Sequence, residues 1–502
     1  MTSTGGSAQS VHAAPPIPAF AWTLAALALL ALIAPTFLPI DATIGLALAV
    51  GLGLLPIAAL VAFRQPFLLC LVFVIFSFFR IHEAFPALGP LRIPQLMAAP
   101  TMAILGWRLF GTRTVKPYWS RELTALSVFF GLVTVGMLFA VDRATAIGYW
   151  TSTYVKIFAM VLVIAWLSRH EREFALVSRA LVVAGILVAS VALYNKANSI
   201  GLVEGTRVTI GRDIGSVLGD PNDLSLVLLF PLSFAVALVT TRTGWASALL
   251  GLLGAGMIVA AIIATQSRGG LLGAVAVAGI FGARMVKSKV VLLSVGGLAM
   301  MVLFAAAGIS GRASGGAAES GIDESSMGRL YAWGAAWKMA LTRPLTGVGL
   351  DNFTGNYFFY SSHWDGMNHA VHSTWFGVMG ETGFPGIVSF VTMIVLTAIT
   401  AFRTRALADE LDLPRAVRQV AQALPAGIVG FCISGTFLTQ GFTWPFYIQL
   451  ALVVATSQFA NEALRNATAT ARAATRKPAK ARKTATFAGG IAGPHPADRG
   501  SR

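Results

Sequence analysis

Charged residues are scarce in this sequence. Asp, Glu, Lys and Arg together make up 12% of its 502 residues, whereas 56% are hydrophobic. A typical soluble domain carries about 25% charged residues. The apolar residues gather in runs close to the roughly 20 residues that a helix needs to cross a bilayer. The sequence therefore predicts a polytopic membrane protein and excludes an ordinary water-soluble enzyme.

Cysteine is nearly absent as well. The two cysteines, Cys70 and Cys432, both lie inside apolar runs. Two such residues cannot supply a disulfide framework or a cysteine-based metal site.

The sequence also lacks the common nucleotide-binding and hydrolase motifs. It contains no P-loop, no GxGxxG, no DxD pair and no GxSxG. A group transferred by this protein is therefore expected to arrive on a lipid carrier rather than through ATP or a nucleotide sugar, and no cofactor is expected.

Fourteen apolar runs are candidate membrane spans, and about 12–14 spans are expected because several runs are short. The first run, from Ala19 to Leu38, has no basic segment before it and no small-residue cleavage site, so we expect it to be retained. The candidate spans are 19–38, 43–63, 67–79, 93–110, 122–141, 147–167, 174–194, 224–240, 245–265, 271–286, 289–309, 384–402, 423–438 and 444–461.

Lys and Arg are concentrated in alternate loops, which by the positive-inside rule face the cytoplasm. This pattern puts both termini inside and two long loops, 195–223 and 310–372, outside. The predicted divisions are an N-terminal cytoplasmic segment (1–18), a membrane bundle (19–309) that includes the loop 195–223, a large external loop (310–372), C-terminal membrane helices (373–461) and a basic disordered cytoplasmic tail (462–502).

The tail is strongly basic. Its predicted partners are anionic membrane lipids, because Lys and Arg beside a last span usually report topology. Nucleic-acid binding is the weaker interpretation.

Within the larger external loop, the segment SSMGRLYAWGAAWKMALTRP predicts one helix, with Ser325 or Ser326 as N-cap and Pro344 closing it. Leu330, Trp333, Trp337 and Leu341 recur at helical spacing as an apolar stripe. Such a stripe suits a helix in the membrane interface, or one that packs on the rest of the loop, and the two are compatible.

Several polar residues lie at the outer ends of spans, where ionisable groups suggest function. Arg268, in QSRGG, can hold a phosphate through its planar guanidinium, although a snorkelling arginine is the alternative. Arg207 and Arg212 precede the next span and can share a diphosphate with Arg268. The segment DPND, which contains Asp220, Asn222 and Asp223, can bind substrate or can be a turn and helix cap.

Three histidines close the large loop: His363, His369 and His372. Their spacing invites a zinc site, but no HExxH motif or acidic third ligand accompanies them, so no metal is expected. The other hypothesis is that His372, nearest the membrane, acts as a general base near neutral pH. A solvated surface histidine is the remaining alternative.

Four stretches in this order resemble the O-antigen ligase and polymerase superfamily of bacterial envelope glycosyltransferases. They are GDPNDLS (219–225), QSRGG (266–270), GRLYAWGAAWKMALTRPLTGVGLDNF (328–353) and HSTWFGVMGETGFPG (372–386). The last matches the family pattern of His, then Asn, Ser or Gln, nine residues, Gly, two residues and Gly, at His372, Ser373, Gly383 and Gly386.

The resemblance implies an all-α membrane bundle of the GT-C-like kind with a large periplasmic loop, in the bacterial inner membrane. The donor would be a glycan linked to undecaprenyl diphosphate, used on the periplasmic side by an inverting mechanism without metal. Arg268 would hold the diphosphate, with Arg207 or Arg212 as a second arginine, and His372 would be the base. Arg329 would shape the cavity roof with the Gly347 and Gly349 turn, and Glu381 would orient His372 or the following helix.

The superfamily contains polymerases that join repeat units, ligases that transfer the glycan to lipid A core, and oligosaccharyltransferases that transfer it to protein. The run TRPLTGVG is most similar to members from exopolysaccharide clusters, so a polymerase is favoured. A flippase for the same lipid-linked sugar is an alternative of another class, but it predicts charged residues near the midplane and repeated halves, which the sequence lacks. A non-catalytic scaffold would tolerate changes at Arg268 and His372.

Overall fold

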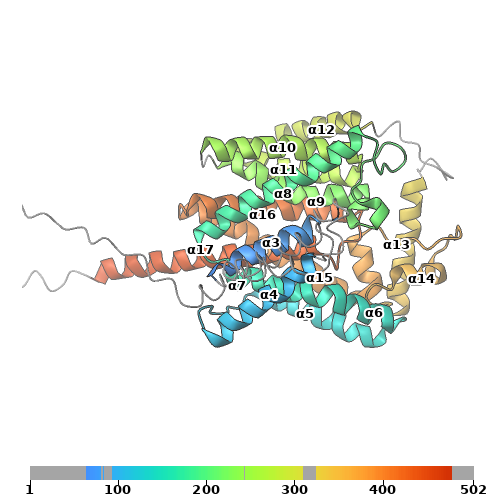
Figure 1. Cartoon of the computed structure of the whole chain (residues 1–502), viewed down its shortest axis with the longest axis horizontal. Helices are drawn as coiled ribbons and strands as arrows, with labels where there is room; N and C mark the ends of the chain where they lie inside the picture. Colours follow the sequence, from blue (N-terminus) through green and yellow to red (C-terminus); the bar gives the residue numbers. More distant parts are fainter. Residues whose placement is uncertain (1–63, 81–82, 84–92, 242–243, 309–323, 477–502) are drawn as a thin grey trace, which may run out of the picture.

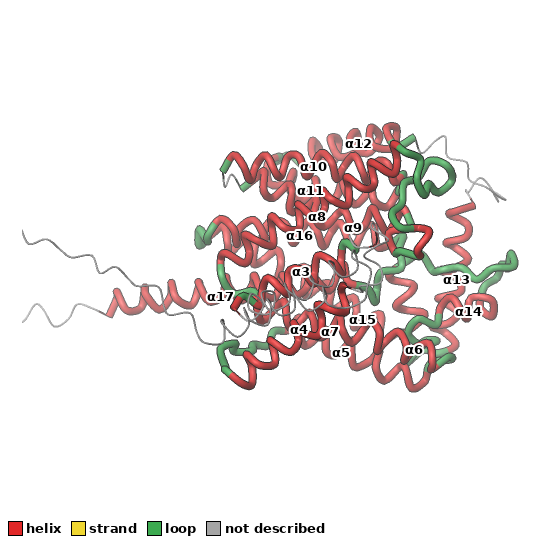
Figure 2. Tube along the Cα trace, in the orientation of Figure 1, coloured by secondary structure: helices red, strands yellow, loops and turns green. Residues whose placement is uncertain are grey.

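A computed structural model describes residues 64–80, 83, 93–241, 244–308 and 324–476. These residues form helices joined by loops, with no strand among them (Figure 2). Eight of the described helices are long and apolar enough to cross a membrane. The predicted all-α, polytopic membrane fold is confirmed.

The described helices vary in length. They are α3 (Pro66–Phe78), α4 (Ile93–Gly106), α5 (Arg121–Gly136), α6 (Arg143–Tyr149), α7 (Val155–Leu167), α8 (Glu171–Ala197), α9 (Pro221–Thr240), α10 (Trp245–Thr265), α11 (Arg268–Met285), α12 (Lys289–Ala306), α13 (Glu324–Thr342), α14 (Phe353–Tyr360), α15 (Thr374–Glu410), α16 (Arg415–Gly435) and α17 (Trp444–Arg476). The helix α6 continues through a short π-helical turn into α7.

The two ends of the bundle differ. Most helices run side by side, whereas α13 lies across one end of the bundle, with α14 beside it (Figure 1). The loop between α8 and α9 lies at this same end, and α17 extends from the opposite end. The two loops predicted to be external therefore share one end of the molecule, which we call the loop end.

The predicted spans from 67–79 onward each coincide with a described helix, whereas 19–38 and 43–63 lie outside the described residues. Three boundaries are corrected. The helix α15 begins at Thr374 rather than at 384, and α13 begins at Glu324, so neither Ser325 nor Ser326 is its N-cap. The helix α17 continues to Arg476, so residues 462–476 of the predicted disordered tail are helical. This segment is rich in Ala and Arg, strong helix formers that extend an existing helix easily.

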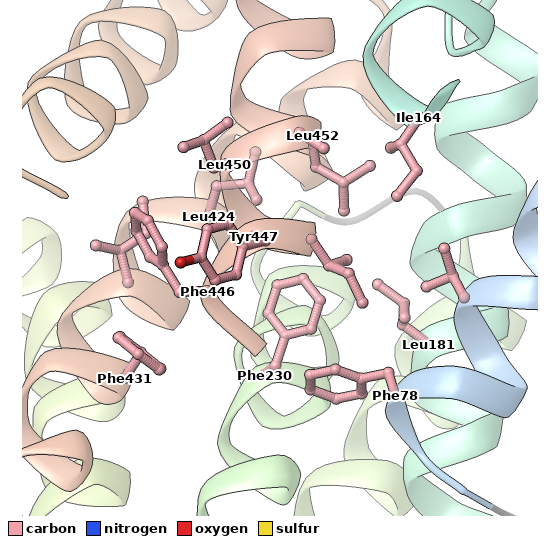
Figure 3. Close-up of a cluster of buried hydrophobic side chains, with 14 of the residues drawn as sticks. Phe78, Ile164, Leu181, Phe230, Leu424, Phe431, Phe446, Tyr447, Leu450 and Leu452 are labelled. Carbon is pink, nitrogen blue, oxygen red and sulfur yellow. The ribbon is translucent and has the colours of Figure 1, made fainter. Parts of the chain in front are cut away.

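The core is formed where α9 and α16 pass through the middle of the bundle. In both helices 78% of the membrane-spanning window is buried, against 0% for α12. Figure 3 shows rings and leucines of several helices packed together, including Phe230 of α9 and Phe431 of α16. Membrane helices associate through such van der Waals contact, because lipid gives little hydrophobic force between them.

The buried face of α13 differs from the predicted stripe. Its buried residues are small, Ala332, Ala335, Ala336 and Ala340 together with Met339, and they pack on the first half of α15. Of the stripe, Trp333 stacks on Phe376 at 5.1 Å between ring centroids. The other members stay exposed by 47–55%, which suits an interfacial helix: Leu330, Trp337 and Leu341.

A kink at Gly383 divides α15. Gly383 has φ 69° and ψ −169°, a conformation essentially restricted to glycine. The kink frees the N–H of Phe384 to donate to the carbonyl oxygen of Pro344 over 2.8 Å, which ties α15 to the end of α13. A Cβ on Gly383 would lie 2.5 Å from that carbonyl oxygen.

Replacement of Gly383 by alanine is therefore expected to destabilise the protein. The side chain meets both an unfavourable backbone conformation, which costs about 1–3 kcal/mol, and the backbone of Pro344. Thermal unfolding in detergent measures the effect as a lower midpoint. Gly279→Ala in α11 is the matched control, because nothing lies within 4 Å of its Cβ position. Equal midpoints for the two variants would contradict a requirement for glycine at the kink.

Candidate functional site

The N-termini of three helices meet at the loop end, around the α16–α17 connection. The N-caps are Asp220 for α9, Ser267 for α11 and Ser373 for α15. Close packing joins α11 to α9, since a Cβ on Gly270 would lie 2.4 Å from the hydroxyl oxygen of Ser225. Helix N-termini carry partial positive charge, so this arrangement favours a bound anion.

The α16–α17 connection ties these N-termini together. The hydroxyl of Thr374 donates to the carbonyl of Leu438 over 2.7 Å and accepts from the backbone N–H of Gln440 over 3.2 Å. The side-chain amide of Gln440 donates to the carboxylate of Asp223 over 2.6 Å. One short loop therefore fixes the start of α15 against the start of α9.

The DPND segment caps α9 and also binds side chains from the loop before it and from the α16–α17 connection. The carboxylate of Asp220 accepts from the backbone N–H groups of Asn222, over 2.7 Å, and Asp223, over 3.3 Å. The side-chain oxygen of Asn222 accepts from the guanidinium of Arg207 over 2.8 Å. Asn222 and Asp223 thus stabilise the site rather than point into open space.

The two loop arginines have different surroundings. Arg207 is buried, with 5% of its surface exposed, and its guanidinium also donates to the carbonyl of Thr265 over 3.1 Å and lies 3.7 Å from the carboxylate of Glu204. Arg212 is exposed and donates to the carbonyl of Gly219 over 3.2 Å. Arg207 therefore holds the loop against the end of α10, whereas Arg212 lies at the surface against Gly219.

Arg268 is the first residue of α11 and is partly exposed. The chain reaches it through Gln266, which has φ 52° and accepts a hydrogen bond from Thr206 over 2.9 Å. Because Arg207 donates to Thr265, the structure brings Arg207 and Arg268 to the same turn between α10 and α11.

His372 lies two residues before α15 in a left-handed conformation, with φ 44°. Such a conformation is uncommon for a bulky residue and is often found at functional sites. Burial lowers the pKa of His372, as do the positive charges of Arg329 and His369, whereas the negative charge of Asp220 raises it. Asp220 from the start of α9 and Arg329 from α13 thus act on the same imidazole. An imidazole with a lowered pKa is neutral at pH 7 and can accept a proton.

The hydrogen bonds of Glu381 go to the turn before α14 rather than to His372, and its role in orienting His372 or the following helix stays a prediction. Its carboxylate accepts hydrogen bonds from the backbone N–H groups of Asp351 and Phe353, the latter over 3.1 Å. It thereby holds the start of α14 and the turn before it.

The turn that contains Gly347 and Gly349 is hydrogen-bonded to both α15 and the α5–α6 corner. Val348 and Gly349 donate to the carbonyls of Gly380 and Glu381 over 2.9 and 3.0 Å. A Cβ on Gly347 would lie 2.4 Å from the carbonyl oxygen of Gly380. Since the N–H of Val141 also donates to the carbonyl of Val348 over 2.9 Å, the turn links α15 to the α5–α6 corner, and its predicted part in the cavity roof stays a prediction.

The three histidines do not share one set of partners. His363 stacks on Tyr331 at 4.8 Å between centroids, and the ring of His369 lies 2.8 Å from the carboxylate of Asp365. Within the described residues, no group of three or more His, Cys, Asp or Glu side chains is arranged to hold a metal ion.

The α16–α17 connection belongs to the site, although the sequence did not predict it there. Its signal is the polar and glycine-containing run GTFLTQGFTW (435–444), which separates two apolar spans at the loop end. Gln440 is 4% exposed and contacts two of the three helix N-termini, which only the folded chain reveals.

Residues 253–391 match the family model described as O-antigen ligase. The matched segment contains Arg268, α13, His372 and the glycines of the α15 kink, and it leaves out the loop with Arg207 and Arg212. No curated protein matches the chain. The family points to a glycosyltransferase-like enzyme of the ligase or polymerase type, in keeping with the multi-pass membrane bundle. The resemblance to the O-antigen ligase and polymerase superfamily is thereby confirmed, and it rests on residues 253–391 of the chain.

Proposed function

We propose that this protein transfers glycan from undecaprenyl diphosphate to a sugar hydroxyl, on the periplasmic side of the bacterial inner membrane. One observation carries the proposal: Arg268, the N-termini of α9, α11 and α15, and His372 gather at the loop end of the bundle. Cations and helix N-termini suit a diphosphate, and a neutral histidine suits proton removal. The helix α17, which leads into the basic tail, extends from the opposite end, so the positive-inside rule supports a cytoplasmic location for that end.

In this mechanism His372 removes the proton from the acceptor hydroxyl. The oxygen attacks the anomeric carbon from the face opposite the diphosphate, and the bond from that carbon to the phosphate oxygen breaks with its electron pair. The released lipid diphosphate carries the new negative charge, which Arg268 and the helix N-termini stabilise. Such preorganised positive groups make a metal ion unnecessary for this step.

For the second arginine we favour Arg212 over Arg207. Arg207 is buried, and its guanidinium already has Thr265, Asn222 and Glu204 as partners. A diphosphate would have to displace these contacts, whereas Arg212 is exposed and donates to the carbonyl of Gly219. Arg207 is then a positioning residue for the loop.

Polymerisation of exopolysaccharide or O-antigen repeat units is the favoured reaction, on the similarity of TRPLTGVG to members of that kind. The glycan of a strain lacking this protein tests it. Loss of chain length supports a polymerase. Full-length glycan that remains on its lipid carrier would instead support a ligase to lipid A core or an oligosaccharyltransferase to protein.

Two substitutions are expected to shift the pH dependence of kcat/KM in opposite directions. The shift concerns the acid limb, the range in which activity falls as the pH is lowered. The active form of His372 is neutral, so that limb reports its pKa. Asp220→Asn removes the negative charge that raises this pKa and keeps a good helix cap, so activity should persist to lower pH. Arg329→Gln removes a positive charge that lowers the pKa, so the limb should move to higher pH.

The profile of kcat/KM against pH, measured with purified protein in detergent, checks both shifts. His369 also acts on His372 and is left unchanged in both variants. Shifts of the same sign, or no shift in either variant, would contradict the assignment of this limb to His372.

A further inference from the structure

A row of aromatic side chains runs outward from the segment that leads into α15. The ring of His369 lies 5.3 Å from that of Tyr357, and Tyr357 lies 6.4 Å from Trp364. Trp364 meets Phe358 at 4.8 Å, and Phe358 meets Phe359 at 5.3 Å, all between centroids. The rings therefore form a continuous series that begins three residues before His372.

The outer members of this series are exposed. Tyr357 is 1% exposed and anchors the row, whereas Phe358 is exposed by 51%, Trp364 by 43% and Phe359 by 73%. We call Phe358, Phe359 and Trp364 the aromatic platform. Three adjoining exposed rings form a contiguous apolar patch, which on a protein surface usually marks an interaction site.

The position of the platform argues against contact with the hydrocarbon of the membrane. The spanning helices run along one direction, and the segment between α14 and α15 projects beyond the loop end along that direction (Figure 1, Figure 2). The helix α13 lies across the same end and marks the level of the interface. Helix α14 and the segment after it, which carry the platform, therefore lie on the aqueous side, and Tyr357 links the platform to His369.

Polar groups border the platform. The carboxylate of Asp365 follows Trp364 directly, pairs with His369 at 2.8 Å and accepts from the backbone N–H of Met367 over 3.1 Å. Flat rings offer a large and rigid contact area at low entropic cost. Together with acceptors at the rim, they match a sugar, whose ring faces are C–H and whose edges are hydroxyl groups.

We propose that the aromatic platform binds the saccharide chain of the acceptor and guides it to His372. The proposal rests on the proposed function, because His372 is the group that would face the acceptor hydroxyl. Phe358, Phe359 and Trp364 are binding residues, and the transfer chemistry does not depend on them.

Binding of lipid-free sugar tests the platform separately from transfer. The probes are the repeat-unit oligosaccharide, released from its lipid by mild acid, and the core oligosaccharide of the same cells' lipopolysaccharide. Affinity is measured with purified full-length protein in detergent by titration calorimetry. Trp364→Ala and Phe359→Ala are each expected to weaken binding of the acceptor sugar about tenfold, as loss of a stacked ring does. Trp364→Tyr should keep most of the affinity.

Trp245→Ala is the matched control, because Trp245 is 82% exposed and begins α10 at the opposite end. His372→Gln should bind both probes as the wild type does. If the platform variants bind like the wild type, or if neither probe binds, the platform does not hold the saccharide and instead serves another partner. If transfer proceeds with an unchanged KM in Trp364→Ala, the platform proposal fails while the transferase function stands.

Discussion

Replacement of His372 by glutamine is expected to reduce glycan transfer by roughly 10²–10⁴-fold, the usual contribution of a general base. Glutamine keeps a hydrogen-bonding side chain of similar length but cannot take the proton from a hydroxyl near neutral pH. The rate of release of undecaprenyl diphosphate by purified protein measures the loss. Binding of the donor should change little, because the diphosphate is assigned to arginines and helix N-termini.

His363→Gln is the matched control. His363 belongs to the same loop and stacks on Tyr331, but it is exposed and is not among the charges that act on His372. It should retain nearly full transfer. An unfolding midpoint equal to that of the wild type shows that His372→Gln keeps the fold. Full activity in a folded His372→Gln variant would remove the histidine from the mechanism.

Replacement of Arg268 by lysine is expected to slow transfer by about 10²–10³-fold, the effect of losing one donor to a developing negative charge. Lysine keeps the positive charge but cannot offer two parallel N–H groups to a diphosphate. The loss should lie mainly in kcat, because charge on the leaving group grows as the bond to the sugar breaks. Single-turnover rates with saturating donor measure it.

Arg284→Lys tests whether the effect is specific. Arg284 lies in the last turn of the same helix, α11, and its guanidinium pairs with Asp409 over 2.5 Å. A lysine can replace this ion pair, so transfer should remain near the wild-type rate. Equal losses in the two variants would assign the effect to the stability of α11 rather than to the diphosphate.

Much of the fold follows from hydrophobicity alone. The spans from residue 67 onward appear as helices because an apolar run in lipid must satisfy its backbone hydrogen bonds internally. Helix ends were harder to predict. The apolar run predicts a span from residue 384, ten residues after the observed start of α15, because Glu381 and the glycines of GETGFPG interrupt the run. The helix nevertheless passes through them with a kink at Gly383.

The sequence was enough to predict which residues belong to the site, but not which partners they contact. Arg268, His372 and Asp220 are conspicuous because polar groups at span ends are few. The roles of Arg207 and Glu381 depend on tertiary partners: Asn222 and Thr265 for the arginine, and the backbone of Phe353 for the carboxylate. These pairs are far apart in the sequence, so no local pattern reveals them.

Transfer from purified lipid-linked donor in detergent tests the proposed reaction most directly. The wild-type protein should release undecaprenyl diphosphate and form a longer or newly attached glycan with inverted anomeric configuration, without added metal or nucleotide. His372→Gln should bind the donor and leave it intact. A protein that folds and binds the donor but never consumes it, while moving it across the bilayer of a proteoliposome, would contradict the transferase and identify a flippase.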